Sequence, residues 1–137
     1  MTDIGTELEG FTVDFTRADL RAYATASGDH NPIHLDDTVA AAVGLPGVIA
    51  HGMLTMGHAA RVVTEAFGPT SLRSLAVRFT RPVVVPPADA IPNTAAVTFS
   101  GTVTAIDAQT RIATVSLSAV FNGQTVLARA EARAQLP

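Results

Sequence analysis

Residues 51–67 read HGMLTMGHAARVVTEAF, and in a helix their apolar side chains would be spread around much of the circumference. The glycines and alanines among them would keep such a helix narrow. A helix that is apolar on nearly all sides is stable when other parts of the protein cover it. We therefore predict one long helix over 51–67 that lies in the interior.

Two further helices are predicted upstream of this segment. Residues 16–19 (Thr-Arg-Ala-Asp) fit a capping start, because an acidic residue follows a threonine by three positions. The helical spacing then continues up to Gly28, a residue type that suits a helix end. Asp36 or Asp37 is expected to start a short helix that continues through Val43.

Downstream of residue 70 the apolar residues alternate with polar ones, which is typical of half-buried strands. The sequences at 107–110 and 122–123 are turn sequences that would join three of these strands as hairpins. The prolines after residue 81 mark a loop at 85–93. The predicted strands are an opening strand at 9–15 and later strands at 74–85, 94–106, 111–121 and 124–134.

This order of elements favours the α+β class, with an antiparallel β-sheet against one long buried helix. A sheet wrapped around a single apolar central helix is the hot-dog fold, and the pattern alone leaves it as one topology among several. The length of 137 residues predicts one domain spanning 1–137. Because 47% of the residues are hydrophobic and only 15% are charged, we also expect a dimer or a larger assembly that covers part of the surface.

Composition argues against several functional classes. The net charge of −3, without a cluster of Lys and Arg, argues against a nucleic-acid partner. The absence of cysteine removes disulfides, thiolate nucleophiles and zinc–thiolate sites. The apolar stretch Val39–Ala50 is shorter than the roughly 20 residues of a membrane span, and no glycine-rich nucleotide-binding pattern is present. No nucleotide cofactor is therefore expected. Because nothing resembles a signal peptide, we also expect a soluble cytoplasmic protein.

Reactive side chains are concentrated in residues 27–36, which read SGDHNPIHLD. Gly28 permits unusual dihedral angles and the proline disfavours helix for the residue before it, so this segment is expected to be a loop. In such a loop the side chains of Asp29, Asn31 and His34 can converge. The alternative is an ordinary turn with a structural histidine, because Gly-Asp and Asn-Pro are common turn dipeptides.

A second candidate feature is the start of the apolar helix at His51 and Gly52. The free amides of a helix start, together with the helix dipole, suit a developing negative charge on oxygen. Gly52 would also let a substrate carbonyl approach the backbone. The alternative is that His51 only caps the helix and Gly52 only permits packing. With the loop, this feature indicates proton transfer beside a carbonyl group, since no serine or cysteine nucleophile is evident.

Three segments of the chain resemble one known family. Residues 26–36 (ASGDHNPIHLD) and 47–56 (GVIAHGMLTM) match two signature blocks of MaoC-like dehydratases and (R)-specific enoyl-CoA hydratases. Residues 77–83 (VRFTRPV) are similar to the family's strand that follows the central helix. The likeness is closest to the catalytic subunit of mycobacterial (3R)-hydroxyacyl-acyl-carrier-protein dehydratases, and it implies one hot-dog domain.

The resemblance implies a hydro-lyase of fatty-acid metabolism, which adds water reversibly to trans-2-enoyl-CoA or acyl-carrier-protein thioesters and forms (3R)-hydroxyacyl thioesters. Asp29 and His34 would hold and activate one water molecule, and Asn31 would orient them. Gly52, through its amide, and His51 would bind the substrate at the oxyanion site, where the thioester carbonyl lies. No cofactor is implied. The expected partners are the thioester substrate and either a second copy of this chain or a related hot-dog subunit.

Two other functions stay open. A hot-dog acyl-CoA thioesterase would hydrolyse the same substrates, although such enzymes generally lack the Asp-x-Asn-Pro-x-His loop. A non-catalytic partner subunit would shape the substrate tunnel of a heterodimeric dehydratase, although such subunits usually lack the acid–base pair.

Metal binding is not expected. His30 and His34 have helical spacing, but a proline stands between them and prevents a helix. His51 and His58 are seven positions apart, with no acidic ligand close to them on the same helix.

Overall fold

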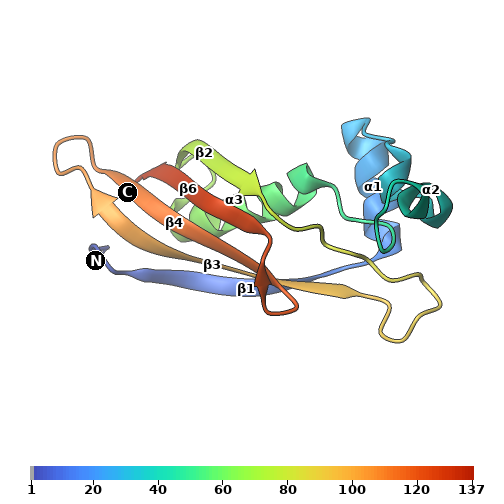
Figure 1. The fold of residues 1–137 in the computed structure, drawn as a ribbon. Coiled ribbons are helices and arrows are strands. Elements are labelled where there is room, and N and C mark those ends of the chain that lie inside the picture. The colour runs from blue at the N-terminus through green and yellow to red at the C-terminus, as the bar shows by residue number, and fades with distance from the viewer. Residues whose placement is uncertain (1) are drawn as a thin grey trace.

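The computed structural model describes residues 2–137 and contains an antiparallel sheet that covers one long helix, α3 (Gly52–Phe67) (Figure 1). The sheet has six strands in the order β1-β3-β4-β6-β2, with the short β5 paired to β4 outside this path. The helix contacts each of the five longer strands. This arrangement confirms the predicted α+β hot-dog fold. The strands are β1 (Glu7–Phe15), β2 (Leu72–Phe79), β3 (Ala95–Ile106), β4 (Ile112–Phe121), β5 (Gln124–Thr125) and β6 (Leu127–Gln135).

Two shorter helices, α1 (Arg17–Ser27) and α2 (Asp37–Ala42), lie together at one end of the molecule, near the first turn of α3 (Figure 1). The predicted capping box is present, because the side chains of Thr16 and Asp19 each accept a hydrogen bond from the other residue's amide. Asp36 caps α2 by accepting hydrogen bonds from two amides of its first turn. The cap residues therefore fix where the chain enters each helix.

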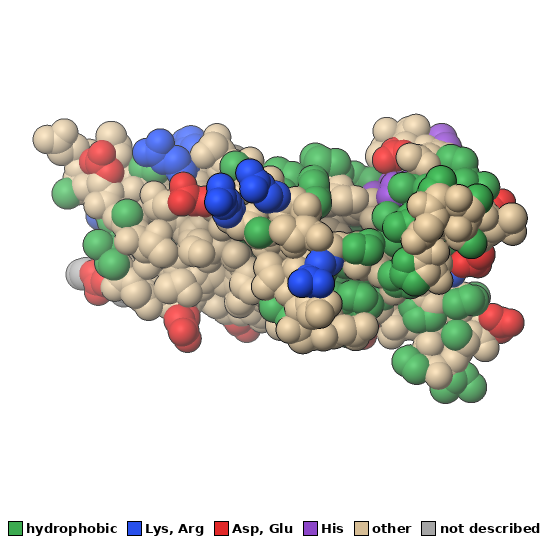
Figure 2. Space-filling view, in the orientation of Figure 1, with side chains coloured by type: hydrophobic (Ala, Val, Ile, Leu, Met, Phe, Trp, Pro, Cys, Tyr) green, Lys and Arg blue, Asp and Glu red, His purple; other side chains and the backbone are tan. Residues whose placement is uncertain are grey.

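The core lies between α3 and the inner face of the sheet. Along β3 the side chains alternate between buried and exposed, and Val97, Phe99 and Val103 face the helix. At Gly101 a Cβ atom would lie 3.0 Å from the Val62 side chain, so this glycine lets the helix approach the strand closely. The outer face of β3 is rich in serine and threonine. In Figure 2 the hydrophobic side chains gather at the end of the molecule with α1, α2 and the loop 85–93.

The strand predicted over 74–85 is wrong at its second half, because β2 ends at Phe79. Pro82 has no amide hydrogen and cannot continue the strand ladder. The chain instead leaves the sheet, and two main-chain hydrogen bonds of 2.9 Å join residues 83–85 to residues 48–50. This pairing brings the segment after β2 alongside the segment that leads into α3.

The strand predicted over 124–134 is two strands, β5 and β6, with Val126 between them. The amide of Val126 donates to the carbonyl of Ala119, and its carbonyl accepts from the amide of Thr80. The chain therefore stays attached to the sheet while it moves from one strand to the next.

The expectation that the long helix is buried on nearly all sides is not met within one chain. Its fully buried residues lie on one face, and Met53 on the outer side is 60% exposed. Among residues 2–137, no helix combines the length and the hydrophobicity needed to cross a lipid bilayer.

Candidate active site

The loop after α1 is shaped by its own hydrogen bonds. Gly28 ends the helix in the left-handed conformation, with φ of 78°. The amide of Asn31 donates to the Asp29 carboxylate at 3.1 Å, and the Asn31 side chain accepts from the amide of Ile33 at 3.2 Å. A short 3₁₀ turn, η1 (Pro32–His34), follows. Asn31 therefore holds Asp29 through its backbone and caps the turn with its side chain, and the carboxylate stays exposed.

The side chain of His34 is 8% exposed and has a fixed orientation. Its Nδ1 lies 2.7 Å from the carbonyl oxygen of Ile49. Because a carbonyl oxygen only accepts hydrogen bonds, Nδ1 carries the hydrogen, and Nε2 of the neutral ring keeps a free lone pair. The amide of Ile49 also donates to the carbonyl of Ile33, which ties the loop to the segment before α3.

His51 lies directly behind His34. The two rings stack with their centroids 4.0 Å apart and an interplanar angle of 26°, and the ring of Tyr23 lies edge-on to His51 with a centroid distance of 4.8 Å. The side chain of His51 is 1% exposed, and its Nε2 donates to the main-chain carbonyl of Asp29 at 3.1 Å. Burial lowers the pKa of His51 and favours the neutral ring. Its Nδ1 is buried and has no hydrogen-bond partner among residues 2–137.

The structure thus brings Asp29, His34 and His51 together. One potential metal-ligating atom of each side chain, a ring nitrogen or a carboxylate oxygen, lies within 4.8 Å of the others. Three such groups can hold a metal ion in principle. The nearly parallel rings of the two histidines, however, direct their in-plane lone pairs side by side and not toward one point. Rotating either ring would break its hydrogen bond to a main-chain carbonyl. This geometry favours proton transfer over metal binding.

The other two histidines lie outside this cluster. His30 is exposed in the loop. His58 packs against the rings of Phe15 and Phe99, and its Nδ1 is 2.8 Å from the Arg61 guanidinium. Burial lowers the pKa of His58, and the charge of Arg61 lowers it further.

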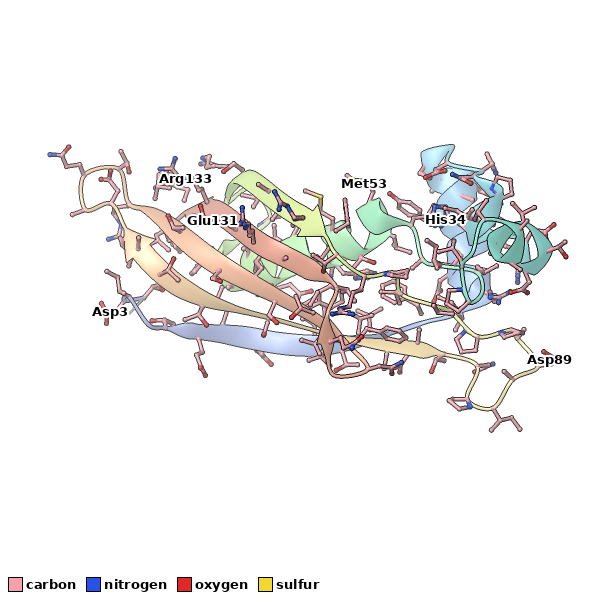
Figure 3. The ribbon with its side chains drawn as sticks, viewed as in Figure 1. Asp3, His34, Met53, Asp89, Glu131 and Arg133 are labelled. Carbon is pink, nitrogen blue, oxygen red and sulfur yellow. The ribbon has the colours of Figure 1, made fainter. Side chains whose placement is uncertain are left out.

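A pocket of about 350 Å³ opens beside His34 at the start of α3. Figure 3 shows His34 between the start of α3 and the two shorter helices. Gly52 is the first residue of the helix, and neither its amide nor that of Met53 finds an acceptor among residues 2–137. A Cβ at Gly52 would lie 3.0 Å from the ring of Phe79, so the glycine makes room between helix and strand. The pocket walls are His34, Ile49, Ala50, Gly52 and Thr55 on one side and residues 79–83 with Val126 and Leu127 on the other.

The site therefore combines a fixed imidazole with a free lone pair, a nearby carboxylate and unpaired helix-start amides at an apolar pocket. Such a set can take a proton from water and stabilise negative charge on a carbonyl oxygen. The His51 side chain does not line the pocket and so stands behind the reacting groups. Sequence reasoning did not propose Thr55 as a functional residue, although its position three residues after Gly52 places both on one helix face.

Comparison with known proteins gives a consistent picture. Residues 2–106 match the family described as MaoC like domain. Over 73 residues the chain is 48% identical to 3-hydroxyacyl-thioester dehydratase X of Mycobacterium tuberculosis, an alignment covering 52% of this chain and 25% of that protein. Over 76 residues it is 43% identical to the peroxisomal hydratase-dehydrogenase-epimerase of Saccharomyces cerevisiae, covering 56% of this chain and 8% of that protein. The matches therefore span a quarter or less of these curated relatives.

Solved structures extend the likeness to nearly the whole chain. A MaoC-like dehydratase superposes with a TM-score of 0.91 at 35% identity, over 99% of this chain and 41% of that one. The (R)-hydratase from A. caviae involved in PHA biosynthesis superposes with a TM-score of 0.86 at 27% identity, over 99% of this chain and 98% of that one.

Proposed function

The chain belongs to the MaoC-like domain family, and on that premise we propose that it is a hydro-lyase that reversibly hydrates trans-2-enoyl thioesters to (3R)-hydroxyacyl thioesters. The observation that carries this proposal is the position of His34, with the Asp29 carboxylate within 4.8 Å of it, in the wall of a pocket that also contains the free amide of Gly52. The names of the mycobacterial dehydratase and of the A. caviae (R)-hydratase support the same reaction class.

In the proposed reaction the acid–base pair holds one water molecule. The water donates its hydrogens to Nε2 of His34 and to the Asp29 carboxylate, and its oxygen adds to C3 of the enoyl chain. One member of the pair takes a proton from the water, and a proton is returned to C2, so that the product contains the elements of one water. A carboxylate oxygen and the free Nε2 of a neutral imidazole both accept hydrogen bonds, which this step requires.

The start of α3 is proposed to bind the thioester carbonyl. When water adds to C3, the electrons of the double bond move toward the carbonyl, and its oxygen becomes enolate-like. The amide of Gly52 and the helix dipole stabilise that negative oxygen. The apolar walls of the pocket are suited to the acyl chain.

Asn31 and His51 have supporting roles in this scheme. Asn31 fixes the Asp29 carboxylate through its amide. His51 was predicted to bind substrate at the oxyanion site, but its ring is buried and bonds the main chain of Asp29. We assign His51 the role of holding Asp29 and His34 in position relative to each other. The contact with the thioester carbonyl is assigned to Gly52.

The proposed assembly is a dimer, formed either by two copies of this chain or with a related hot-dog subunit. The outer side of α3 supports this proposal, because Met53, which is 60% exposed, and the exposed Gly57 lie uncovered on it in the single chain.

The test of this function is the hydration of short enoyl-CoA thioesters by the purified chain and two variants. His34→Gln is expected to lose about 10²–10⁴-fold in kcat, the usual contribution of a general base. His30→Gln, in the same loop but exposed and outside the cluster, is the matched control and should retain full activity. Equal activity of wild type and His34→Gln would contradict the assignment of the pair.

A further inference from the structure

Thr55 is a buried polar residue in the proposed active site that the scheme above does not use. It lies on α3, three residues after Gly52, is 3% exposed and lines the same pocket as His34 and Gly52. A hydroxyl in such an apolar setting normally has a hydrogen-bond partner, because burying it without one is costly.

No residue among 2–137 supplies that partner. Threonines in helices often donate to the carbonyl four residues earlier, as Thr25 does to Arg21 at 3.2 Å. For Thr55 that carbonyl belongs to His51, which already accepts two amide hydrogen bonds, from Leu54 at 3.1 Å and from Thr55 itself at 3.2 Å. The hydroxyl of Thr55 is therefore free to bind a molecule in the pocket.

The other hydroxyl of the pocket wall is already engaged. Thr80 donates its side-chain hydrogen to the carbonyl of Thr125 at 3.1 Å. On the α3 side of the pocket, the free donors are thus the amide of Gly52 and the hydroxyl of Thr55. Residues three apart on a helix share a face, and helix side chains lean toward the N-terminus, so both donors serve the same end of the pocket.

We propose that Thr55 is a catalytic residue whose hydroxyl, together with the amide of Gly52, donates a hydrogen bond to the thioester carbonyl oxygen. This inference rests on the proposed hydratase function. A carbonyl oxygen is an acceptor only, whereas the water is held by the acceptors of Asp29 and His34, so a free donor on the Gly52 side matches the carbonyl. The hydroxyl keeps its hydrogen throughout, while the electrons of the C2–C3 double bond move toward the carbonyl oxygen and back.

The first experiment compares kcat for crotonyl-CoA hydration in matched variants. Thr55→Val removes the hydroxyl at similar volume and is expected to lose about a hundredfold, as for one oxyanion donor. Thr55→Ser keeps the hydroxyl and is expected to stay within a few-fold of wild type. Thr64→Val, on the same helix but outside the pocket, is the control and should leave kcat unchanged. Thr55→Ala gives a second variant without the hydroxyl if the valine disturbs folding.

The second experiment reads carbonyl polarisation directly in a bound ligand. The absorbance of 4-dimethylaminocinnamoyl-CoA moves to longer wavelength when its carbonyl accepts hydrogen bonds. Wild type and Thr55→Ser are expected to give the full shift, and Thr55→Val a smaller one. A packing role for Thr55 would not produce this pattern.

The two proposals fail in different ways. A wild-type chain that does not hydrate enoyl-CoA overturns the proposed function, and the spectral shift, which needs only binding, then judges Thr55 by itself. Unchanged kcat together with an undiminished shift in Thr55→Val overturns the role of Thr55. A change confined to KM, with kcat and the shift preserved, also overturns it, because Thr55 would then only shape the pocket.

Discussion

At the residue scale, two main-chain carbonyls determine what the paired histidines can do. The carbonyl of Ile49 accepts a hydrogen bond from Nδ1 of His34, and the main-chain carbonyl of Asp29 accepts one from Nε2 of His51. His34 therefore presents a free Nε2, whereas Nδ1 of His51 is buried and has no hydrogen-bond partner among residues 2–137. Only one of the two stacked rings is suited to exchange protons with substrate.

The supporting role of His51 predicts a particular kinetic pattern. His51→Phe can keep the stacking with His34 but cannot donate to the Asp29 carbonyl. Loss of one such hydrogen bond is expected to lower kcat about tenfold, with KM nearly unchanged, because the ring does not line the pocket. Steady-state kinetics measure both constants. A large rise in KM at constant kcat would instead show that His51 contacts the substrate.

Two histidines with lowered pKa values also predict how stability depends on pH. Burial lowers the pKa of His51 and His58 below the ordinary 6.5, so just below that value the unfolded chain binds more protons than the folded chain. The contribution of these two histidines to the free energy of unfolding should therefore be complete above pH 6.5 and be lost as the pH falls below that value. The midpoint of urea unfolding at about pH 7.5 and pH 5.5 measures this loss.

The variant His58→Phe isolates one contribution to this loss. Phenylalanine can pack against Phe15 and Phe99 but does not titrate. The difference between the two midpoints should be smaller in the variant than in wild type. An identical difference in both proteins would show that His58 does not contribute.

At the scale of elements, one arginine joins three segments around the site. Nε of Arg17, in the first turn of α1, donates to the carbonyl of Val85 at 2.8 Å, and the guanidinium pairs with Asp37 of α2 at 2.8 Å. Its hydrogen bonds to the Asp37 carboxylate, and then its charge, lower the pKa of Asp37. Arg17 thus holds α1, α2 and the segment paired with 48–50 together.

Arg17→Met keeps the apolar stem but leaves the buried Val85 carbonyl without its donor. We expect the free energy of unfolding to fall by about 1–3 kcal/mol, mainly from that unpaired carbonyl, since the Asp37 carboxylate is largely exposed. Urea unfolding measures the change. Arg21→Met, on the exposed side of the same helix, is the matched control, and an equal effect of both variants would contradict this role.

Elements whose signals are local were predictable from the sequence. The capping box at 16–19, the cap at Asp36 and the turn at 122–123 each depend on neighbouring residues, and the structure has all of them. The break after β2 was not foreseen, because alternation continues past Phe79 in the sequence. Pro82 cannot continue the strand ladder, and the path of the chain after it is set by the pairing of 83–85 with 48–50, a long-range contact that a local pattern does not show.

The residues of the candidate site also divide into those that the sequence indicated and those that depend on contacts in three dimensions. The resemblance indicated Asp29, Asn31, His34 and Gly52. In the structure His34 and Gly52 line one pocket, a carboxylate oxygen of Asp29 lies within 4.8 Å of a ring nitrogen of His34, and the amide of Asn31 donates to Asp29. Their catalytic roles stay a prediction. The stacking of His51 on His34 and the free hydroxyl of Thr55 depend on which acceptors are already occupied in three dimensions. That occupancy is a tertiary property, so the sequence could not show it.

At the scale of the whole molecule, the uncovered side of α3 is the main feature that one chain leaves unexplained. Gly57 lies exposed on the helix, and a Cβ added there would meet no atom within 4 Å. A glycine in a helix interior costs about 1 kcal/mol relative to alanine, so its presence suggests a close approach from outside.

If two copies pair through this side of α3, Gly57→Glu should convert the dimer into a monomer without unfolding it. The added side chain has room within one chain but would place a charge in the interface. Light scattering after size exclusion is expected to give twice the mass of one chain for wild type and for the control Gly57→Ala, and one chain mass for Gly57→Glu. A single-chain mass for wild type would contradict pairing between copies of this chain.

Crotonyl-CoA, followed at once by its enone absorbance and by a thiol reagent, separates hydration from thioester hydrolysis in a single assay. Wild-type protein is expected to remove the enone band without releasing thiol, and Asp29→Asn to lose about 10²–10⁴-fold of that rate while remaining folded. Release of free thiol with the enone band intact, or an Asp29→Asn variant as fast as wild type, would contradict a water-handling pair at Asp29 and His34.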